Sequence, residues 1–161
     1  MKFKGKSPNT KKVGFNFINH KINEIGLSKA YQSDKKLYVD GDSLFIAGTS
    51  DKQDVYDDIT KIPFYGDLKK SNRYIDVDNV LKNNPNVKNV IGHSLGGSVA
   101  LELEKNNPNR YKTTTYGAPV ISLTKGNRFR HGNDPFSSFD YGAKTIGFNV
   151  NPLNAHSYSD Y

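Results

Sequence analysis

The feature that most constrains this chain is the stretch 87–104, VKNVIGHSLGGSVALELE, where three local patterns follow one another without a break. An apolar run that ends at Ile91 predicts a short strand, and a serine between glycines comes next. Leu95, Val99 and Leu103 then recur every four residues, as they do on one face of a helix. A strand, a sharp turn and a helix in direct succession are the structural context of the G-x-S-x-G pattern.

Steric crowding explains why glycines surround Ser94. A serine on so sharp a turn has a strained backbone, so its neighbours two residues away must lack side chains. Gly92 and Gly96 meet that need, and Gly97 lets the following helix lie close to the sheet. The side chain of His93, directly before the serine, is expected to diverge from the hydroxyl.

We therefore predict a nucleophile elbow at 91–97. Such a turn holds the Ser94 hydroxyl at the positive end of a helix, and the backbone N–H of Leu95 points toward an oxyanion formed by attack of the serine. The alternative is a turn serine that does no more than cap the helix. The strand pattern before the turn and the helix pattern after it favour the nucleophile.

A nucleophilic serine at neutral pH needs a base, and the base needs a carboxylate to orient it. In hydrolases built on such a turn the chain order is serine, acid, histidine, which favours His156 as the base, with His131 as the second choice. Asp134 is the favoured acid because it follows a predicted strand and precedes a proline in a loop. Asp140 is the reserve choice.

A second source of oxyanion donors lies earlier in the chain. Two β-rich runs, 37–39 and 43–47, flank the pair Asp40-Gly41, which predicts a hairpin. The second run is almost entirely apolar, as expected for a strand covered on both faces. It leads into Gly48-Thr49, where backbone N–H groups would face the serine; an ordinary turn is the alternative.

The remaining elements are expected to complete one α/β domain. A helix over 15–30, on which Phe15, Ile18, Ile22 and Ile25 share a face, is expected to pack on the sheet with that face and not to bind a membrane, with His20 at its surface. A short helix at 55–62 ends at Pro63, with Ile62, Phe64 and Tyr65 at an acyl groove or in the core. Further elements are a helix opened by Ser71 and stopped at 83–85, and strands at 112–116, 127–131 and 145–148.

The length of 161 residues fits a single domain, which we place at 13–161, and ten tyrosines with nine phenylalanines supply a core. The chain has no cysteine, which excludes disulfides and thiol chemistry. No stretch approaches a membrane span, and the first residues lack the apolar core of a secretory signal. We expect a soluble protein that begins inside a cell, alone, in a virion or within a longer precursor.

The net charge of +7 is concentrated at the N-terminus. Residues 1–12 form a basic arm without a single acidic residue, whose lysines are Lys2, Lys4, Lys6, Lys11 and Lys12. We expect a solvated, flexible tail. The alternative is an arm that contacts anionic lipid or nucleic acid, but no aromatic interleaving and no known nucleic-acid module supports the second of these.

Several motifs together resemble the class 3 (fungal-type) lipase family of α/β-hydrolases. They occur in the family's order and span about two-thirds of the chain: Ala-Gly-Thr at 47–49, Gly-His-Ser-Leu-Gly-Gly at 92–97, Thr-Tyr-Gly-Ala-Pro at 115–119, Asn-Asp-Pro at 133–135 and His-Ser-Tyr at 156–158. Gly-His-Ser-Leu-Gly-Gly alone fits many hydrolases. The later motifs make the resemblance more specific.

The resemblance implies a compact α/β-hydrolase fold, with a mostly parallel sheet flanked by helices, and a serine esterase that hydrolyses acylglycerol or phospholipid esters. It makes Ser94 the nucleophile, Asp134 the acid and His156 the base, with Thr49 and Leu95 as the oxyanion hole. No metal and no cofactor is expected. The family usually has arginine where this chain has Ala47, and the chain is shorter than the secreted lipases, which leaves the lid and the acyl-chain length open.

Two other functions compete with this prediction. One is a hydrolase-like module without catalytic activity that binds anionic lipid or nucleic acid through its lysines. The other is a peptidase or thioesterase on the same fold.

Overall fold

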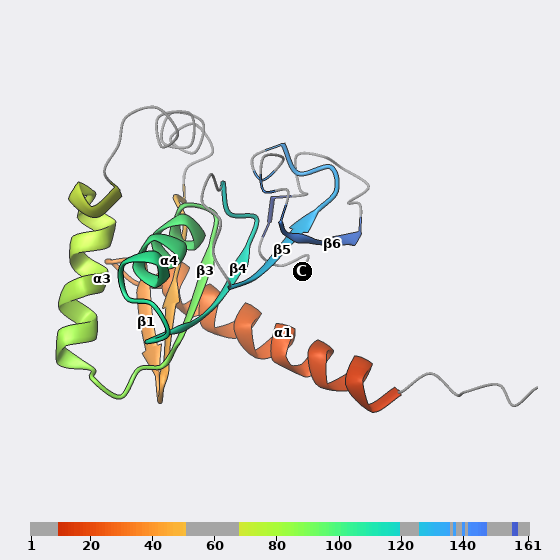
Figure 1. The fold of residues 1–161 in the computed structure, drawn as a ribbon, viewed down its shortest axis with the longest axis horizontal. Coiled ribbons are helices and arrows are strands. Elements are labelled where there is room, and N and C mark those ends of the chain that lie inside the picture. Colours follow the sequence, from red (N-terminus) through yellow and green to blue (C-terminus); the bar gives the residue numbers. More distant parts are fainter. Residues whose placement is uncertain are drawn as a thin grey trace, which may run out of the picture.

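A computed structural model describes residues 10–50, 68–119, 126–135, 137, 140, 142–147 and 156–157. For residues 10–17 and 147 it gives the backbone alone. Within these residues a six-stranded sheet has its strands in chain order, β1 to β6 (Figure 1). β1 and β2 are antiparallel, and every later neighbour is parallel. The elements are α1 (Thr10–Gln32), β1 (Leu37–Asp40), β2 (Ser43–Ile46), the 3₁₀ helix η1 (Leu68–Lys70), α3 (Asn72–Asn83), β3 (Asn89–His93), α4 (Leu95–Asn106), β4 (Lys112–Tyr116), β5 (Asn127–His131) and β6 (Lys144–Gly147).

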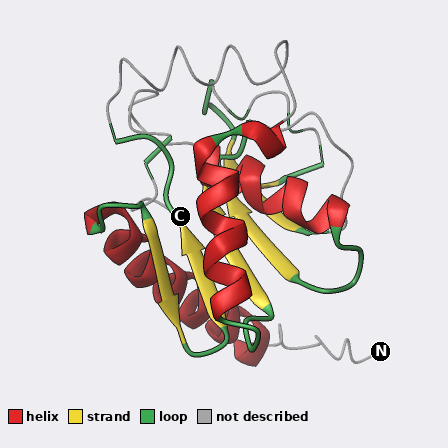
Figure 2. Cartoon of the chain, turned by 90° about the vertical axis from the view of Figure 1, so that its left-hand side faces the viewer, coloured by secondary structure: helices red, strands yellow, loops and turns green. Residues whose placement is uncertain are grey.

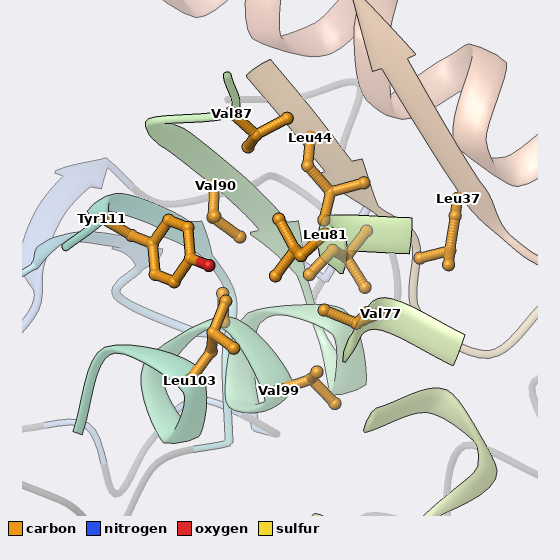
Figure 3. Packing of buried hydrophobic residues seen from close by; sticks show 11 residues of the cluster. Leu37, Leu44, Val77, Leu81, Val87, Val90, Val99, Leu103 and Tyr111 are labelled. Atoms are coloured by element: carbon orange, nitrogen blue, oxygen red, sulfur yellow. The ribbon is translucent and has the colours of Figure 1, made fainter. Parts of the chain in front are cut away.

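Helices cover both faces of the sheet, with α1 on one side and α3 with α4 on the other (Figures 1 and 2). Successive side chains of a strand point to opposite faces. Leu44 and Ile46 of β2 therefore join the cluster under α3 and α4, which Figure 3 shows, whereas Phe45 joins the cluster under α1. Burial on both faces explains why this run is almost entirely apolar, as predicted. The chain is an α/β protein with a mostly parallel sheet flanked by helices.

Several predicted boundaries are confirmed. The Ser71 side chain caps α3 by accepting a hydrogen bond from the N–H of Tyr74 at 3.1 Å, and the helix ends at Asn83. The last predicted strand is β6, at the edge of the sheet, one residue earlier than expected at each end. Helix α1 begins at Thr10, so the end of the basic arm is helical. The helix and groove predicted within 55–65 lie outside the described residues.

The prediction for the buried face of α1 was wrong. Ile18, Ile22 and Ile25 are 58%, 54% and 58% exposed, and Leu27 and Ala30 pack on the sheet instead. Helix α1 carries two apolar stripes, and the sheet takes the one that allows close approach. A Cβ on Gly26 would stand 2.3 Å from the Phe45 ring, so a bulky residue on that face would not fit.

The surface position expected for His20 was also wrong. Its ring is half-buried, 2.7 Å from the Tyr116 hydroxyl through Nδ1, and it meets the rings of Tyr116 and Phe129 edge-on. Burial lowers the pKa of His20. The prediction failed because α1 is long enough to place His20 beside Tyr116 of β4 and Phe129 of β5.

Among the described helices, none combines the length and the apolar character that a bilayer crossing requires.

Candidate active site

Ser94 lies between the last residue of β3 and the first residue of α4. Its backbone has φ 53° and ψ −126°, a region that non-glycine residues rarely adopt and that costs of order 1–3 kcal/mol. The Ser94 N–H donates to the carbonyl of Tyr116 on β4 at 3.0 Å, and the N–H of Gly97 donates to the Ser94 carbonyl at 2.8 Å. The serine is therefore fixed to the sheet and to the helix by its own backbone.

Each glycine around this serine lies where an added side chain would collide with a neighbouring element, and at Gly92 and Gly96 the obstacle is backbone. A Cβ on Gly92 would stand 2.4 Å from the carbonyl oxygen of Gly96, and a Cβ on Gly96 would stand 2.2 Å from the carbonyl oxygen of Ile46. A Cβ on Gly97 would stand 2.7 Å from the Ala118 side chain. Because backbone cannot swing aside as a side chain can, α4 can lie this close to β2 and β3 only with glycine at positions 92 and 96.

A chain of hydrogen bonds links Ser94 to the two partners that the sequence favoured. His156 Nε2 lies 2.7 Å from Ser94 Oγ, and His156 Nδ1 lies 2.9 Å from Asp134 Oδ2. A carboxylate can only accept, so Nδ1 carries the proton and donates to Asp134. Nε2 then accepts the hydrogen bond of the Ser94 hydroxyl.

Asp134 is placed by its own surroundings. The residue is 1% exposed, and Oδ2 also accepts a hydrogen bond from Ser137 Oγ at 2.6 Å. The N–H of Asp134 donates to the carbonyl of His131 at 3.2 Å, so the reserve histidine belongs to the turn that carries the acid. The reserve acid, Asp140, is buried with its Oδ1 3.6 Å from Nε of Arg128.

The end of β2 lies beside the serine. A Cβ on Gly48 would stand 2.8 Å from the Ser94 Cβ, so Gly48 lies directly against the serine side chain. The Ala47 carbonyl accepts a hydrogen bond from the Arg73 guanidinium of α3, and the Gly48 N–H donates to the Tyr31 hydroxyl at 3.0 Å. This segment is therefore held from two sides.

The other donor that the sequence predicted, the Leu95 N–H, belongs to α4. Leu95 is the first residue of the helix, and the first N–H groups of a helix have no acceptor within it. Leu95 directly follows Ser94 at the start of α4, and Gly48 approaches Ser94 from beyond the end of β2. The assignment of Thr49 and Leu95 to an oxyanion hole stays a prediction.

His93 has a role in the geometry that sequence reasoning missed. Its Nδ1 lies 2.6 Å from the Tyr31 hydroxyl, and its Nε2 lies 2.7 Å from the backbone carbonyl of His156. A carbonyl can only accept, so Nε2 carries the proton and Nδ1 accepts from Tyr31. Burial, with the nearby His156 as a lesser cause, lowers the pKa of His93 to about 3, so the ring is neutral at any ordinary pH.

These hydrogen bonds join both sides of the site. Tyr31 accepts from the Gly48 N–H and donates to His93, and His93 donates to the segment that carries the candidate base. The sequence held no signal for this arrangement, because Tyr31 and His93 are 62 residues apart.

In the part of the chain that the structure describes, no group of three or more His, Asp or Glu side chains could hold a metal ion. Comparisons of the chain with models of known families, with curated proteins and with solved structures gave no match.

Proposed function

We propose that this chain is a serine esterase that hydrolyses carboxylic esters of lipids through an acyl-enzyme. One observation supports this proposal above all: three side chains from distant parts of the sequence form a continuous hydrogen-bonded chain from Asp134 through His156 to Ser94. That order, with a serine on a strained turn before a helix, is what general-base activation of a hydroxyl requires. The turn at 91–97 is then a nucleophile elbow and the fold a compact α/β-hydrolase.

The reaction would proceed in two steps. His156 Nε2 takes the proton of Ser94 as Oγ attacks the ester carbonyl, and Asp134 stabilises the imidazolium that forms. The N–H of Leu95 and the backbone and hydroxyl of Thr49 bind the oxyanion, at about 3 kcal/mol per donor in comparable sites. His156 then protonates the leaving alcohol, and a water activated by the same ring releases the acid from Ser94.

The substrate class rests on the resemblance to class 3 lipases and on charge. The motifs at 47–49, 92–97, 115–119 and 133–135 favour an acylglycerol or phospholipid ester as the substrate. The net charge of +7 favours substrates presented on anionic surfaces, which points toward membrane lipid.

Hydrolysis of p-nitrophenyl esters of graded chain length tests the proposal. We expect Ser94→Ala to lower kcat by on the order of 10⁴–10⁶. Ser98→Ala is the matched control: it lies one turn further along α4, and its hydroxyl donates to the Pro119 carbonyl, away from the hydroxyl of Ser94. It should keep its activity. Wild type no faster than Ser94→Ala would favour a module without catalytic activity.

Two further measurements separate the remaining alternatives. A fluorophosphonate probe should add one adduct to the wild-type chain and none to Ser94→Ala, which intact-mass analysis detects. Thioester and peptide substrates beside the ester panel would reveal a thioesterase or a peptidase, because the preferred leaving group differs between these classes.

A further inference from the structure

The outer face of α1 carries an apolar stripe that packs against none of the described elements. Ile18, Ile22 and Ile25 follow one another at spacings of four and three residues, so they lie on one side of the helix. They are 58%, 54% and 58% exposed, on the side away from Leu27 and Ala30, which pack on the sheet. A helix that is apolar on two opposite sides is normally covered on both.

This stripe lies within the most basic part of the chain. Residues 1–32 contain seven lysines and one acidic residue, Glu24, so six of the seven net positive charges belong to this segment. Within α1, Lys29 follows Ile25 by one turn, so a lysine lies next to the isoleucine stripe. A hydrogen bond with Tyr38 raises the pKa of Lys29, which keeps it charged.

The exposed isoleucines and the surrounding positive charge together indicate which kind of partner could cover the stripe. A second copy of the chain would bring lysine-rich helices together, and stable interfaces need about 20–30 residues on each side, far more than this stripe supplies. A nucleic acid would pair with the lysines but would leave the isoleucines in water. An anionic bilayer satisfies both, with hydrocarbon for the isoleucines and phosphate for the lysines.

We propose that α1 docks this chain on the surface of an anionic lipid bilayer. The isoleucine stripe enters the boundary between headgroups and acyl chains, and the net positive charge of residues 1–32 attracts the anionic surface. Such peripheral binding needs two weak signals together, apolar insertion and charge, and this segment has both. The inference does not depend on the catalytic proposal, because it uses no residue of the Ser94 site.

Vesicle co-sedimentation tests the docking, with the Ser94→Ala chain so that no lipid is consumed. We expect binding to vesicles of phosphatidylcholine with phosphatidylglycerol, and much weaker binding to phosphatidylcholine alone. Replacing Ile18, Ile22 and Ile25 with asparagine should weaken binding roughly tenfold or more. The matched control is Ile75→Asn with Ile146→Asn, which removes isoleucines of similar exposure, 48% and 43%, from α3 and β6.

A second pair of variants separates charge from insertion. Lys11→Gln with Lys12→Gln should weaken binding by about fivefold per lysine, and added salt should act in the same direction. Lys35→Gln with Lys88→Gln, both exposed and outside the segment, should bind as before.

Three results would overturn the proposal. The first is a triple isoleucine variant that folds, by circular dichroism and denaturant unfolding, and binds anionic vesicles as the parent does. The second is a wild-type dimer in light scattering that the triple variant converts to monomer, because a second copy would then cover the stripe. The third is binding to a polynucleotide with no binding to either vesicle.

Discussion

The two sides of the candidate site are held in place by different means. On the Ser94 side the restraints are backbone: the hydrogen bond of the Ser94 N–H to Tyr116, and two glycines, Gly92 and Gly96, at which a Cβ would collide with a carbonyl oxygen. On the acid and base side the restraints are side chains. Asp134 is held by Ser137 and His156, and the buried pair Arg128 and Asp140 lies in the same region.

This difference separates what local sequence decides from what the fold decides. A turn built on backbone contacts needs glycines at fixed positions, so a few neighbouring residues are enough to predict it. A carboxylate and an imidazole placed by side-chain hydrogen bonds depend on residues far apart in the chain. We therefore expect the nucleophile turn to tolerate distant substitutions better than the acid and base side does.

The largest effect that tests this comparison is expected for Asp134→Asn. An amide in place of the carboxylate favours the imidazole tautomer with its proton on Nε2, which cannot accept the proton of Ser94. By analogy with other serine triads, kcat should fall by about 10⁴ while the fold is kept. The measurement is kcat with a short p-nitrophenyl ester, beside a denaturant unfolding curve.

The reserve acid supplies the control for this prediction. Asp140→Asn changes an equally buried carboxylate in the same region, yet Asp140 contacts Arg128 and not His156 in the described geometry. It should cost stability and leave kcat within about tenfold when measured well below the unfolding temperature. If instead Asp140→Asn lost activity and Asp134→Asn kept it, the two acids would have to exchange roles.

The same contrast explains how much the sequence could predict. The serine turn and its glycines, the Ser71 cap and the doubly covered β2 strand each follow from a few adjacent residues. The partners of Ser94 were chosen by chain order and by a resemblance, because 62 residues separate Ser94 from His156. The sequence left two candidates for the base and two for the acid. Only the folded chain shows which of them lie beside Ser94.

What the sequence could not predict lies in long-range contacts and in the choice of a helix face. Tyr31 meets His93 and His20 meets Tyr116 across separations of 62 and 96 residues, for which no local pattern exists. Helix α1 has two apolar stripes, and periodicity cannot tell which one meets the sheet. The deciding contact, Gly26 against Phe45, is a property of packing and not of pattern.

A smaller effect, on stability, is expected for Arg128→Met. The guanidinium of Arg128 lies so close to Gly142 that a Cβ there would overlap it, and its Nε is 3.6 Å from Asp140 Oδ1. Burial raises the pKa of Asp140, and the charge of Arg128 opposes that rise. Removing the arginine takes away the largest of the interactions that offset the burial of this carboxylate, which should lower the free energy of unfolding by about 3–5 kcal/mol.

Amide hydrogen exchange would show which strands and helices lose stability in Arg128→Met. If the two sides are held independently, Arg128→Met should speed amide exchange in β5 and β6 more than in β3 and α4. The double variant Arg128→Met with Asp140→Asn should recover part of the lost stability, because no charge is then buried alone. Equal loss of protection in β3 and α4 would mean that the site is a single cooperative unit.

The smallest effect concerns His93, which bridges the two sides. Its pKa is lowered to about 3 in the folded chain, against about 6.5 in an unfolded one. Unfolding therefore binds a proton at any pH between these values, so stability is complete above about pH 6.5 and is lost as the pH falls. The free energy of unfolding should decrease between pH 6.5 and 5, by at most about 1.4 kcal/mol per pH unit from this ring.

Replacing the ring with one that does not titrate isolates this contribution. His93→Gln should be less stable than wild type at pH 7, because the hydrogen bonds of the imidazole to Tyr31 and to the His156 carbonyl are disturbed. Its stability should nevertheless fall less steeply toward pH 5, in denaturant titrations at pH 7, 6 and 5. His20→Gln is the matched control: burial also lowers the pKa of His20, but that ring is half-buried, so removing it should flatten the profile less. Parallel pH profiles for wild type and His93→Gln would mean that the ring titrates alike in both states, and that the bridge between the two sides is looser than the hydrogen bonds indicate.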